Sequence, residues 1–450
     1  MIALPKDVKM IINRLSERGY EAFAVGGCVR DSLLGILPKD YDITTSARPD
    51  EIIAAFPELS YFDAGIKHGT VSLIVDGTVY EVTTYRVDGD YLDHRHPDNV
   101  IFVSSITDDL ARRDLTINAM AYSDERGLCD PFGGADELKT GIVRAVGDPR
   151  KRFDEDALRI LRALRFASVY GFSIDGDTST AIHELSYLIK DVAFERVKAE
   201  LDRLLCGKNV GYILREYHDV IEKVIPEISV TVGYDQGTKY HEFDLWEHIV
   251  RTVENVPPNV TLRYTMLLHD LGKPSSRTID RRGQCHYKGH AMASIPIARE
   301  ITARLKFDKK TADDIVCLVG AHMDAPPTDR PSARRMIKNY GVSRTEMLLH
   351  VMRADNLSKK SDGENDPRIP ETAAARVLVE SVVHDGDACT LSALAVGGND
   401  LIALGASRGR AIGEMLETLL DMVIDGKLEN RRDDLLDFAK KIVNNEKNCK

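Results

Sequence analysis

The stretch that decides the fold is Val25-Gly26-Gly27-Cys28-Val29-Arg30-Asp31, which is followed by Lys39-Asp40-Tyr41-Asp42-Ile43-Thr44. Two glycines let backbone N–H groups come close to a phosphate, and the helix expected after them directs its positive end at that charge. Asp40 and Asp42 fall on the same face of an expected strand, because side chains alternate along a strand. Neighbouring carboxylates repel each other unless a cation lies between them, and their hard oxygens favour Mg²⁺. A phosphate cradle beside a magnesium-binding pair predicts nucleotidyl transfer.

The composition is that of a protein with several domains in a reducing compartment. A chain of 450 residues is too long for a single hydrophobic core. No apolar run is long enough to span a bilayer, and the first residues, Met1 to Lys9, lack the apolar core of a signal peptide. The seven cysteines are scattered without a C-x-x-C pair, which argues against a zinc ribbon or a disulfide framework. We therefore expect a cytoplasmic protein that does not bind membranes.

The net charge of −11 does not exclude a nucleic-acid partner, because charge is distributed locally and bound Mg²⁺ offsets carboxylates. Basic residues gather between Arg144 and Arg165 and again between Arg330 and Lys338. Each cluster alone fits a phosphate-binding surface and a solvated helix face equally well.

Residues 1–139 have the pattern of an α+β domain. An amphipathic helix ending at Gly19 precedes a strand, the glycine turn, a helix and the aspartate strand. Two alternating segments joined by Asp76-Gly77 predict a hairpin. The polar segment Asp88 to Asn99 predicts a mobile loop, and Asp130 to Gly134 a tight turn. From about residue 153 onward the apolar residues follow a helical period, so the rest of the chain should be almost wholly helical.

Glu81, on the second hairpin segment, is the candidate third carboxylate of the metal site. Its strand can pair near that of Asp40, and its side chain faces away from those of Tyr80 and Val82. The alternative is a glutamate that faces solvent on an alternating strand.

The run Arg112-Arg113-Asp114-Leu115-Thr116-Ile117-Asn118 places two arginines beside an aspartate at an expected helix start. Arginine suits a triphosphate and aspartate suits ribose hydroxyl groups. Asp114 and Thr116 alone could be helix caps, but the density of polar residues in the run favours ligand binding.

The most discriminating element is Phe153-Asp154-Glu155-Asp156-Ala157-Leu158-Arg159. On a continuous helix Arg159 projects between Glu155 and Asp156, and the alternative to a functional role is an ordinary helical ion pair. Cytosine and adenine each present an amino donor beside a ring-nitrogen acceptor, whereas uracil and guanine reverse both. An acceptor on Asp156 next to a donor on Arg159 therefore fits C and A and opposes U and G.

With these motifs the chain resembles the bacterial class II tRNA nucleotidyltransferases, the CCA-adding enzymes of the polymerase β superfamily. The glycine turn with its aspartates, the Arg112 run, Glu155-Asp156-x-x-Arg159 and Glu195-Arg196-x-x-x-Glu200 occur in the family's order across nearly the whole chain. The resemblance implies a multidomain protein: an α+β nucleotidyltransferase head with a mixed sheet, then an all-α neck, body and tail. The boundaries expected are 1–139 for the head, 140–205 for the neck, 206–245 for a helical RNA-binding body, 246–360 for an HD domain and 361–450 for a tRNA-binding tail.

The resemblance also implies addition of C, C and A to the 3′ end of tRNA from CTP and ATP with Mg²⁺. It implies that Asp40 and Asp42 bind the metal; together with Glu81, the candidate from its strand position, they are the expected catalytic residues. Glu195 and Arg196 would have a structural role beneath the helix that carries Asp156 and Arg159. Segment Asp90 to Asp98 resembles the family's flexible loop; relatives that add only CC resemble versions without it, so terminal A addition is expected. The protein is expected to be a monomer or a homodimer. The nucleotide-binding residues expected are Gly26, Gly27, Arg30, Arg113, Asp114, Asn118, Asp156, Arg159 and Arg162.

A second set of residues has the order of an HD-domain metal site. Imidazole and carboxylate ligands from different helices suit a divalent transition metal, which can activate water against a phosphate. The nearby Lys273 could bind that phosphate or be solvated. Either a secondary phosphohydrolase activity or an inert scaffold fits this pattern. The residues are His248, His269, Asp270, His290, His322 and Asp355.

Three alternatives remain at this point. The same head occurs in poly(A) polymerases, and an enzyme that adds only the terminal A would share the motifs. A protein of another class, an HD phosphohydrolase whose head only binds nucleotides, would keep its main activity without Asp40 and lose it without His269 or Asp270.

Overall fold

The computed structural model describes residues 2–88 and 100–448, which form two compact units. The first comprises Met1–Ser229 with Arg304–Lys306, and the second Val230–Ala303 with Phe307–Lys450. The α+β head followed by helices is confirmed, whereas the finer division into five domains stays a prediction. The proposed flexible loop Asp90 to Asp98 lies outside the described residues.

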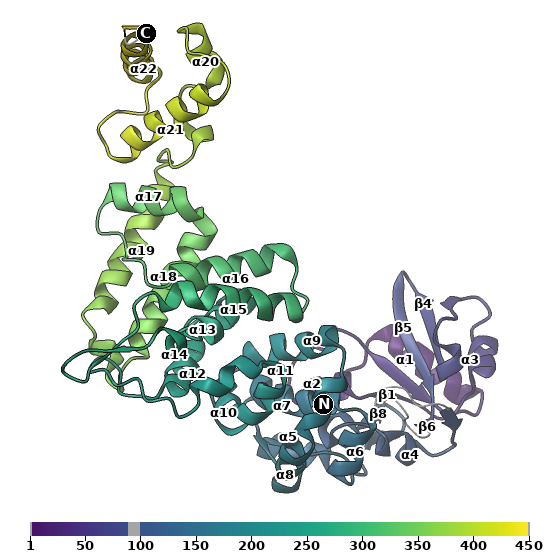
Figure 1. Cartoon of the computed structure of the whole chain (residues 1–450). Coiled ribbons are helices and arrows are strands. Elements are labelled where there is room, and N and C mark those ends of the chain that lie inside the picture. Colours follow the sequence, from purple (N-terminus) through teal and green to yellow (C-terminus); the bar gives the residue numbers. More distant parts are fainter. Residues whose placement is uncertain (1, 89–99, 449–450) are drawn as a thin grey trace. The chain divides into compact units, whose positions relative to one another are not determined.

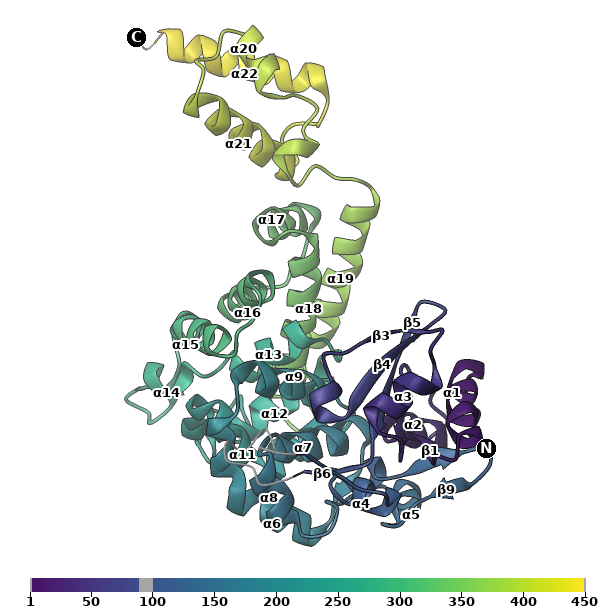
Figure 2. The same ribbon diagram turned by 90° about the vertical axis from the view of Figure 1, so that its right-hand side faces the viewer.

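The head is built on a mixed seven-stranded sheet in the order β3-β4-β5-β2-β1-β8-β9 (Figures 1 and 2). Only the central pair β2–β5 is parallel; the other neighbours run antiparallel. The strands are β1 (Ala22–Val25), β2 (Asp42–Thr45), β3 (Ser60–Phe62), β4 (Thr70–Val75), β5 (Thr78–Thr84), β8 (Ala121–Ser123) and β9 (Gly127–Cys129).

Helices α1 (Lys6–Glu17) and α3 (Pro49–Ala55) pack on the sheet (Figure 1). The apolar side of α1, predicted from its helical period, is fully buried. Along β2 and β5 the buried Ile43 and Val82 alternate with Asp42 and Glu81, whose side chains remain accessible to solvent. The protein around the Asp42 carboxylate nevertheless removes part of its hydration. One face of these strands therefore joins the core, and the other presents carboxylates.

The predicted hairpin is confirmed as β4–β5, and its second strand also pairs with the aspartate strand β2. Asp76 and Gly77 have φ angles of 47° and 81°, the left-handed conformation that a two-residue hairpin turn needs. In the parallel pair β2–β5, Ile43 lies opposite Val82. Asp42 and Glu81 each precede one of these paired residues, so their side chains share a face.

Short elements complete the head. The predicted turn Asp130 to Gly134 is present, and the Asp130 carboxylate accepts hydrogen bonds from the N–H groups of Gly134 and Ala135. The elements are η1 (Ile66–His68), β6 (Arg86–Asp88), β7 (Val100–Phe102), α4 (Ile106–Ala111), η2 (Thr116–Asn118) and α5 (Gly134–Thr140).

After the head the first unit is helical apart from a small parallel pair, β10 (Ile142–Val143) and β11 (Ser173–Ile174). Helix α7 packs against α9, and leucines on both helices are buried. The helices are α6 (Pro149–Glu155), α7 (Leu158–Tyr170), α8 (Gly176–Leu185), η3 (Ser186–Asp191), α9 (Phe194–Leu205), α10 (Val210–Glu216), α11 (His218–Val224) and η4 (Pro226–Thr231).

The second unit is helical except for a hairpin of β12 (Thr278–Ile279) and β13 (Cys285–His286). Among the described residues, no helix combines the length and hydropathy needed to cross a bilayer. The helices are α12 (Leu245–Asn255), α13 (Val260–Leu268), α14 (Lys273–Ser276), α15 (His290–Arg304), α16 (Lys309–Ala321), α17 (Arg330–Tyr340), α18 (Val342–Leu357), η5 (Gly363–Asn365), α19 (Arg368–His384), η6 (Leu391–Ala393), α20 (Gly398–Ala403), α21 (Arg410–Ile424) and α22 (Arg432–Asn448).

Candidate active site

The three candidate catalytic carboxylates gather at the parallel strand pair. The strand begins at Asp42, so Asp40 lies two residues before it and not within it, contrary to the sequence expectation. Burial raises the pKa of Asp42, the charges of Glu81 and Asp40 raise it further, and Arg113 opposes them. No described residue forms a salt bridge with any of the three carboxylates. This excess of negative charge fits a divalent cation.

The glycine turn makes room for an arginine. Gly26 has a φ of 76°, and a Cβ placed on it would lie 2.8 Å from Arg113 Nη1. The Gly26 N–H donates to the carbonyl oxygen of Met120 at 3.0 Å, so it does not serve the predicted phosphate cradle. Helix α2 (Gly27–Leu33) then begins at the second glycine. The turn requires glycine because this positive φ strains any other residue, and the missing side chain also leaves room for the Arg113 guanidinium.

Arg30 lies inside the protein. It is only 8% exposed, and its guanidinium donates to Asp31 at 2.8 and 2.9 Å and to Asn118 Oδ1. The same group stacks over the Phe166 ring at 4.9 Å. These contacts place the Arg30 guanidinium against Asn118, and its predicted role in nucleotide binding stays a prediction.

Asp114 is the centre of a network that joins the head to α7. Its carboxylate accepts from Arg162 Nε at 2.7 Å, Asn118 Nδ2 at 3.1 Å and the Leu115 N–H at 2.8 Å. Although burial opposes ionisation, Arg162 and Asn118 lower the pKa of Asp114 to about 2. A permanently charged carboxylate that is held this firmly is a fixed acceptor.

The predicted continuous helix through Asp156 is interrupted. Helix α6 ends at Glu155, Asp156 has extended backbone angles (φ −144°, ψ 104°), and α7 begins at Leu158. Asp156 accepts from the Leu158 N–H at 3.0 Å and from Arg196 Nη2 at 2.9 Å. The break therefore caps α7 and turns the Asp156 carboxylate toward α9.

The Arg159 guanidinium is held by a side chain just before the break and by a backbone carbonyl oxygen of the head. Its Nη1 donates to Glu155 at 2.7 Å, and its Nη2 donates to the Arg112 carbonyl oxygen at 3.1 Å. Asp156 and Arg159 nevertheless line one pocket of about 270 Å³. Arg113, whose charge also acts on Asp42, belongs to the same pocket and links it electrostatically to the carboxylates. The lining residues are Arg112, Arg113, Asp114, Asp156, Leu158, Arg159, Arg162 and Arg196.

The remaining motif residues and the basic clusters lie largely in ion pairs. Glu195 is exposed at the start of α9, and Glu200 binds Arg165 at 2.5 Å. Four basic residues of α17 face acids of α21 or of the segments that follow α19 and α21. The pairs are Arg330 with Asp385 and Asp387, Arg334 with Asp387, Arg335 with Asp425, and Lys338 with Glu417 and Asp421.

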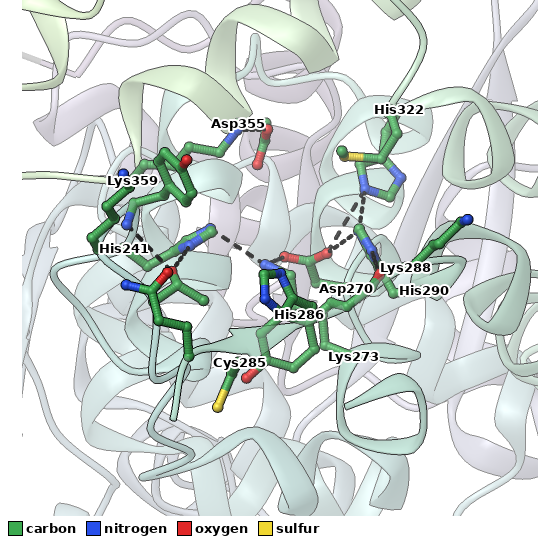
Figure 3. A pocket seen from close by; sticks show the side chains of 16 residues that line it. His241, Asp270, Lys273, Cys285, His286, Lys288, His290, His322, Asp355 and Lys359 are labelled. Atoms are coloured by element: carbon green, nitrogen blue, oxygen red, sulfur yellow. Dashed lines mark hydrogen bonds and ion pairs between the residues drawn. The ribbon is translucent and has the colours of Figure 1, made fainter. Parts of the chain in front are cut away.

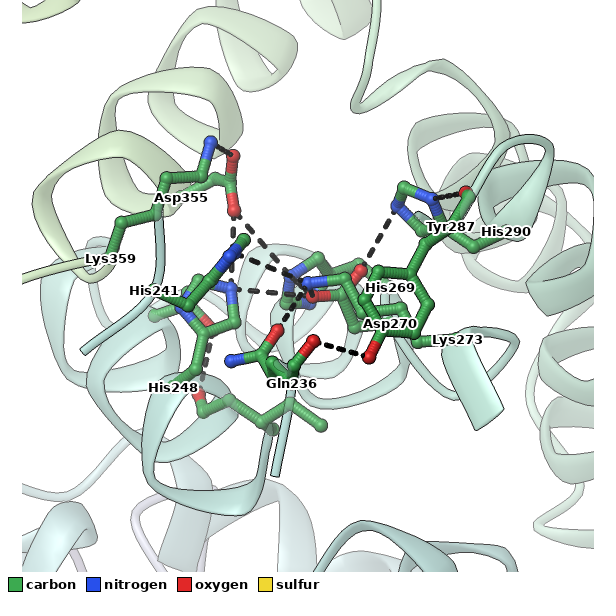
Figure 4. Close-up of polar contacts among 12 residues, drawn as sticks. Gln236, His241, His248, His269, Asp270, Lys273, Tyr287, His290, Asp355 and Lys359 are labelled. Carbon is green, nitrogen blue, oxygen red and sulfur yellow. Dashed lines mark hydrogen bonds and ion pairs between the residues drawn. The ribbon is translucent and has the colours of Figure 1, made fainter. Parts of the chain in front are cut away.

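The six residues of the predicted HD site converge in the second unit, and we refer to them as the histidine–aspartate centre. Figure 3 labels His322, and Figure 4 labels the other five. Two groups of possible ligand atoms share Asp270. The first group is His248, His269, Asp270 and Asp355, and the second is Asp270, His290 and His322. All six side chains are buried.

The backbone fixes which nitrogen of each histidine faces the centre. Every Nδ1 lies within 3.2 Å of a backbone carbonyl oxygen and therefore carries the proton that it donates, so Nε2 presents a lone pair. The two Nε2 atoms of His290 and His322 lie 3.1 Å apart, an unfavourable approach without a shared cation. The four carbonyl oxygens belong to Ser358, Met266, Tyr287 and Val319 for His248, His269, His290 and His322.

The charges of the centre also favour a bound cation. Among the described residues, His248 Nε2 and His269 Nε2 have no well-aligned hydrogen bond, although each lies within 3.3 Å of Asp270 Oδ2. Burial opposes protonation of His248, but its contacts with Asp270 and Asp355 raise its pKa. Burial, with His269 nearby, lowers the pKa of His322 to about 4, which leaves a neutral ligand. Nitrogen and oxygen donors of this kind fit divalent transition metals.

Three further residues of this centre were not predicted from the sequence. Lys359 Nζ lies 2.5 Å from Asp355 Oδ2. The spacing of four residues could have predicted this ion pair from the sequence. His241 and Gln236 come from the loop before α12 and contact Lys273, whose Nζ lies 2.6 Å from Asp270 Oδ2 (Figure 4). Nothing in their spacing pointed to the centre.

Comparisons with known proteins agree with the head and the helical region. The poly A polymerase head domain matches residues 22–144, an RNA- and SrmB-binding site of polymerase A matches 171–230, and a tRNA nucleotidyltransferase domain 2 matches 293–439. With the carboxylates and the arginine-lined pocket, these matches define a nucleotidyltransferase with a polymerase-type head.

Relatives that match along nearly the whole chain are more specific. The chain is 32% identical over 442 residues to the CCA-adding enzyme of Geobacillus thermodenitrificans, covering 98% of both chains. The crystal structure of the Bacillus stearothermophilus CCA-adding enzyme in complex with CTP superposes with a TM-score of 0.69 at 29% identity and 98% coverage of both chains. The Thermotoga maritima CCA-adding enzyme complexed with tRNA shares the fold, with a TM-score of 0.60 at 21% identity and 98% and 97% coverage. The chain belongs to the CCA-adding enzymes, the tRNA nucleotidyltransferases that complete the tRNA 3′ end.

Proposed function

We propose that this chain adds C, C and A in turn to the 3′ end of tRNA, using CTP and ATP and releasing pyrophosphate. The observation that carries the proposal is the pairing of unbalanced carboxylates at Asp42 and Glu81 with an arginine-lined pocket through Arg113. The CTP-bound relative of 29% identity and the tRNA-bound protein of the same fold support these partners.

Asp40, Asp42 and Glu81 would hold Mg²⁺ in this proposal. The cation would lower the pKa of the tRNA 3′-hydroxyl group and stabilise charge on the leaving pyrophosphate. Arg113, held over Gly26 and 3.6 Å from the buried Asp109, would bind the triphosphate. Asp114 would bind the ribose from its fixed position.

Asp156 and Arg159 would select the base. Asp156 supplies an acceptor for the amino group of cytosine or adenine, and Arg159 supplies a donor for the ring nitrogen. Arg196 holds the Asp156 carboxylate, and Glu155 holds the Arg159 guanidinium. The pocket thus presents a preset acceptor and donor to the base without a nucleic-acid template.

We place the reaction in the cytoplasm. Five described cysteines form no disulfide bond, which supports a reducing compartment; they are Cys28, Cys129, Cys285, Cys317 and Cys389.

The test of base selection is extension of a tRNA transcript that ends before CCA. Wild type should add two C residues from CTP alone and complete CCA with both nucleotides. Asp156→Asn should raise incorporation of UTP or GTP relative to CTP and ATP by about tenfold to 100-fold, because an amide both donates and accepts. The matched control is Asp177→Asn, an exposed aspartate of α8. Long A tails from ATP alone would favour a poly(A) polymerase instead, and unchanged selectivity in Asp156→Asn would contradict the assigned role.

A second function is favoured by the histidine–aspartate centre. We propose that it binds a divalent transition metal and hydrolyses a phosphate ester, with Lys273 beside the reacting phosphate. When bound, the metal would polarise the phosphate and activate water. Support comes from the converging Nε2 atoms and from Lys273 in the wall of the adjacent pocket (Figure 3).

A further inference from the structure

One face of helix α7 carries a row of four side chains that runs from the base-selecting pocket to the head helix α2. They follow one another at intervals of three or four residues, as neighbours on one side of a helix do. Arg159 lines the pocket, and Arg162 donates to Asp114. The other end of the row contacts α2 through two aromatic rings. The four residues are Arg159, Arg162, Phe166 and Tyr170.

Phe166 is the centre of a cluster of guanidinium groups. The centroid of its ring lies 3.8 Å from the guanidinium carbon of Arg165, 4.9 Å from that of Arg30 and 5.7 Å from that of Arg162. The Tyr170 ring stacks beside it, with ring centroids 6.0 Å apart and an angle of 6° between the planes. Because the Phe166 ring is buried, these cation–π contacts are stronger than contacts at a surface. Each guanidinium group also has a carboxylate partner; for Arg165, Arg30 and Arg162 these are Glu200, Asp31 and Asp114.

Tyr170 ties this cluster to the head. Its hydroxyl group donates to Asp31 Oδ1 at 3.0 Å, and Arg30 donates to the same oxygen at 2.8 and 2.9 Å. Hydrogen bonds continue from there through the head and return to α7 at Arg162, which lies about two turns before Tyr170. Helix α7 is therefore anchored to the head at two points of the same face. The bonds connect Asp31, Arg30, Asn118, Asp114 and Arg162 in that order.

Both base-reading groups depend on the position of α7. Arg159 lies in its first turn, and the Asp156 carboxylate accepts from the N–H group of Leu158, the first residue of the helix. A rotation of α7 about its axis therefore moves the acceptor and the donor together relative to Arg113, the proposed triphosphate ligand. A hydrogen bond tolerates only a few tenths of an ångström in donor–acceptor distance, so a small rotation weakens the match to the base.

Resting on the proposed selection of C and A, we propose that Phe166 and Tyr170 are positioning residues for base selection. They hold α7 at one rotation against the head, and they act through the helix and not by contact with the nucleotide. Asp156 and Arg159 then meet the edge of cytosine or adenine at hydrogen-bonding distance. Loosening of α7 moves both groups away from this position and reduces the discrimination against uracil.

The test uses the full chain, with Tyr170→Phe as the first variant because it removes only the hydroxyl group that donates to Asp31. Extension of a tRNA transcript that ends before CCA, by CTP alone or by UTP alone, gives kcat and KM for each nucleotide. Tyr170→Phe should lower the ratio of kcat/KM for CTP to that for UTP by about fivefold, the size expected for loss of one hydrogen bond. Its matched control is Tyr187→Phe, at an exposed position of η3, which should keep the wild-type ratio.

Two further variants test the cluster and the path of its effect. Phe166→Leu removes the ring shared by the three arginines and should lower the CTP to UTP ratio by about tenfold or more. In an Asp31→Ala background, Tyr170→Phe should cause no further change, because the partner of the hydroxyl group is already absent.

The ratio does not depend on how much of the enzyme is folded, so a purely structural role would leave it unchanged. Equal losses of CTP and UTP incorporation, with the wild-type ratio kept in both Tyr170→Phe and Phe166→Leu, would overturn the proposal while the proposed base selection stands. If wild type itself does not favour CTP over UTP, the base selection by Asp156 and Arg159 is wrong and the positioning role falls with it.

Discussion

Asp42→Asn is expected to lower the rate of CCA addition by about 10³-fold or more, equivalent to about 4 kcal/mol of transition-state stabilisation. Asparagine keeps the size of the side chain but removes the charge that would hold the metal against the triphosphate. Extension of a tRNA transcript at saturating CTP, ATP and Mg²⁺ measures the loss. Asp50→Asn, at an exposed position of α3, is the matched control and should keep the wild-type rate.

The same variant should not be less stable. Because burial and Glu81 raise the pKa of Asp42, its charge opposes folding at neutral pH, and this cost disappears as the pH falls through the raised pKa. Without metal at pH 7, Asp42→Asn should therefore melt at or above the wild-type temperature. Mg²⁺ should stabilise wild type more than the variant. Normal CCA addition by a folded Asp42→Asn variant would remove Asp42 from the catalytic site.

Asp270→Asn is expected to abolish metal binding and ester hydrolysis at the histidine–aspartate centre while sparing CCA addition. Asp270 is shared by both ligand groups, so its loss affects every possible metal position. Hydrolysis should fall by about 10³-fold, as for loss of a metal's contribution to charge stabilisation. Calorimetric titration with Mn²⁺ and a hydrolysis assay measure the two effects.

His290→Gln separates the two ligand groups, because His290 belongs only to the second. It should remove part of the Mn²⁺ binding, whereas Asp313→Asn, exposed on α16, should match wild type. Loss of CCA addition in Asp270→Asn with full addition by Asp42→Asn would reverse the assignment and favour an HD phosphohydrolase with a nucleotide-binding head.

The parts of the fold that could be predicted from the sequence depend on local rules. Asp76-Gly77 can adopt the two left-handed conformations of a tight turn, so the hairpin could be predicted. Alternation along the second strand then predicted which face of the sheet carries Glu81. The histidine–aspartate centre could be predicted because an adjacent His269-Asp270 pair with spaced partners is a rare pattern. Its members lie on different helices, and the structure brings all of them together.

Features set by distant partners could not be predicted. The sequence at Asp156 contains no glycine or proline that would predict the interruption of the helix. The Asp156 carboxylate instead accepts a hydrogen bond from Arg196, which lies 40 residues further along the chain. Arg30 has the sequence position expected of a phosphate ligand, but its guanidinium donates to Asn118 and lies over the Phe166 ring. In the same way, the arginines of α17 are neutralised by acids more than 50 residues away.

The most direct test of the central claim is a crystal structure of this chain with Mg²⁺ and a nonhydrolysable CTP analogue. The account predicts Mg²⁺ between the carboxylates of Asp40 and Asp42, with the cytosine amino group and N3 facing Asp156 and Arg159. A triphosphate bound away from Asp42, or a cytosine that contacts neither Asp156 nor Arg159, would contradict it.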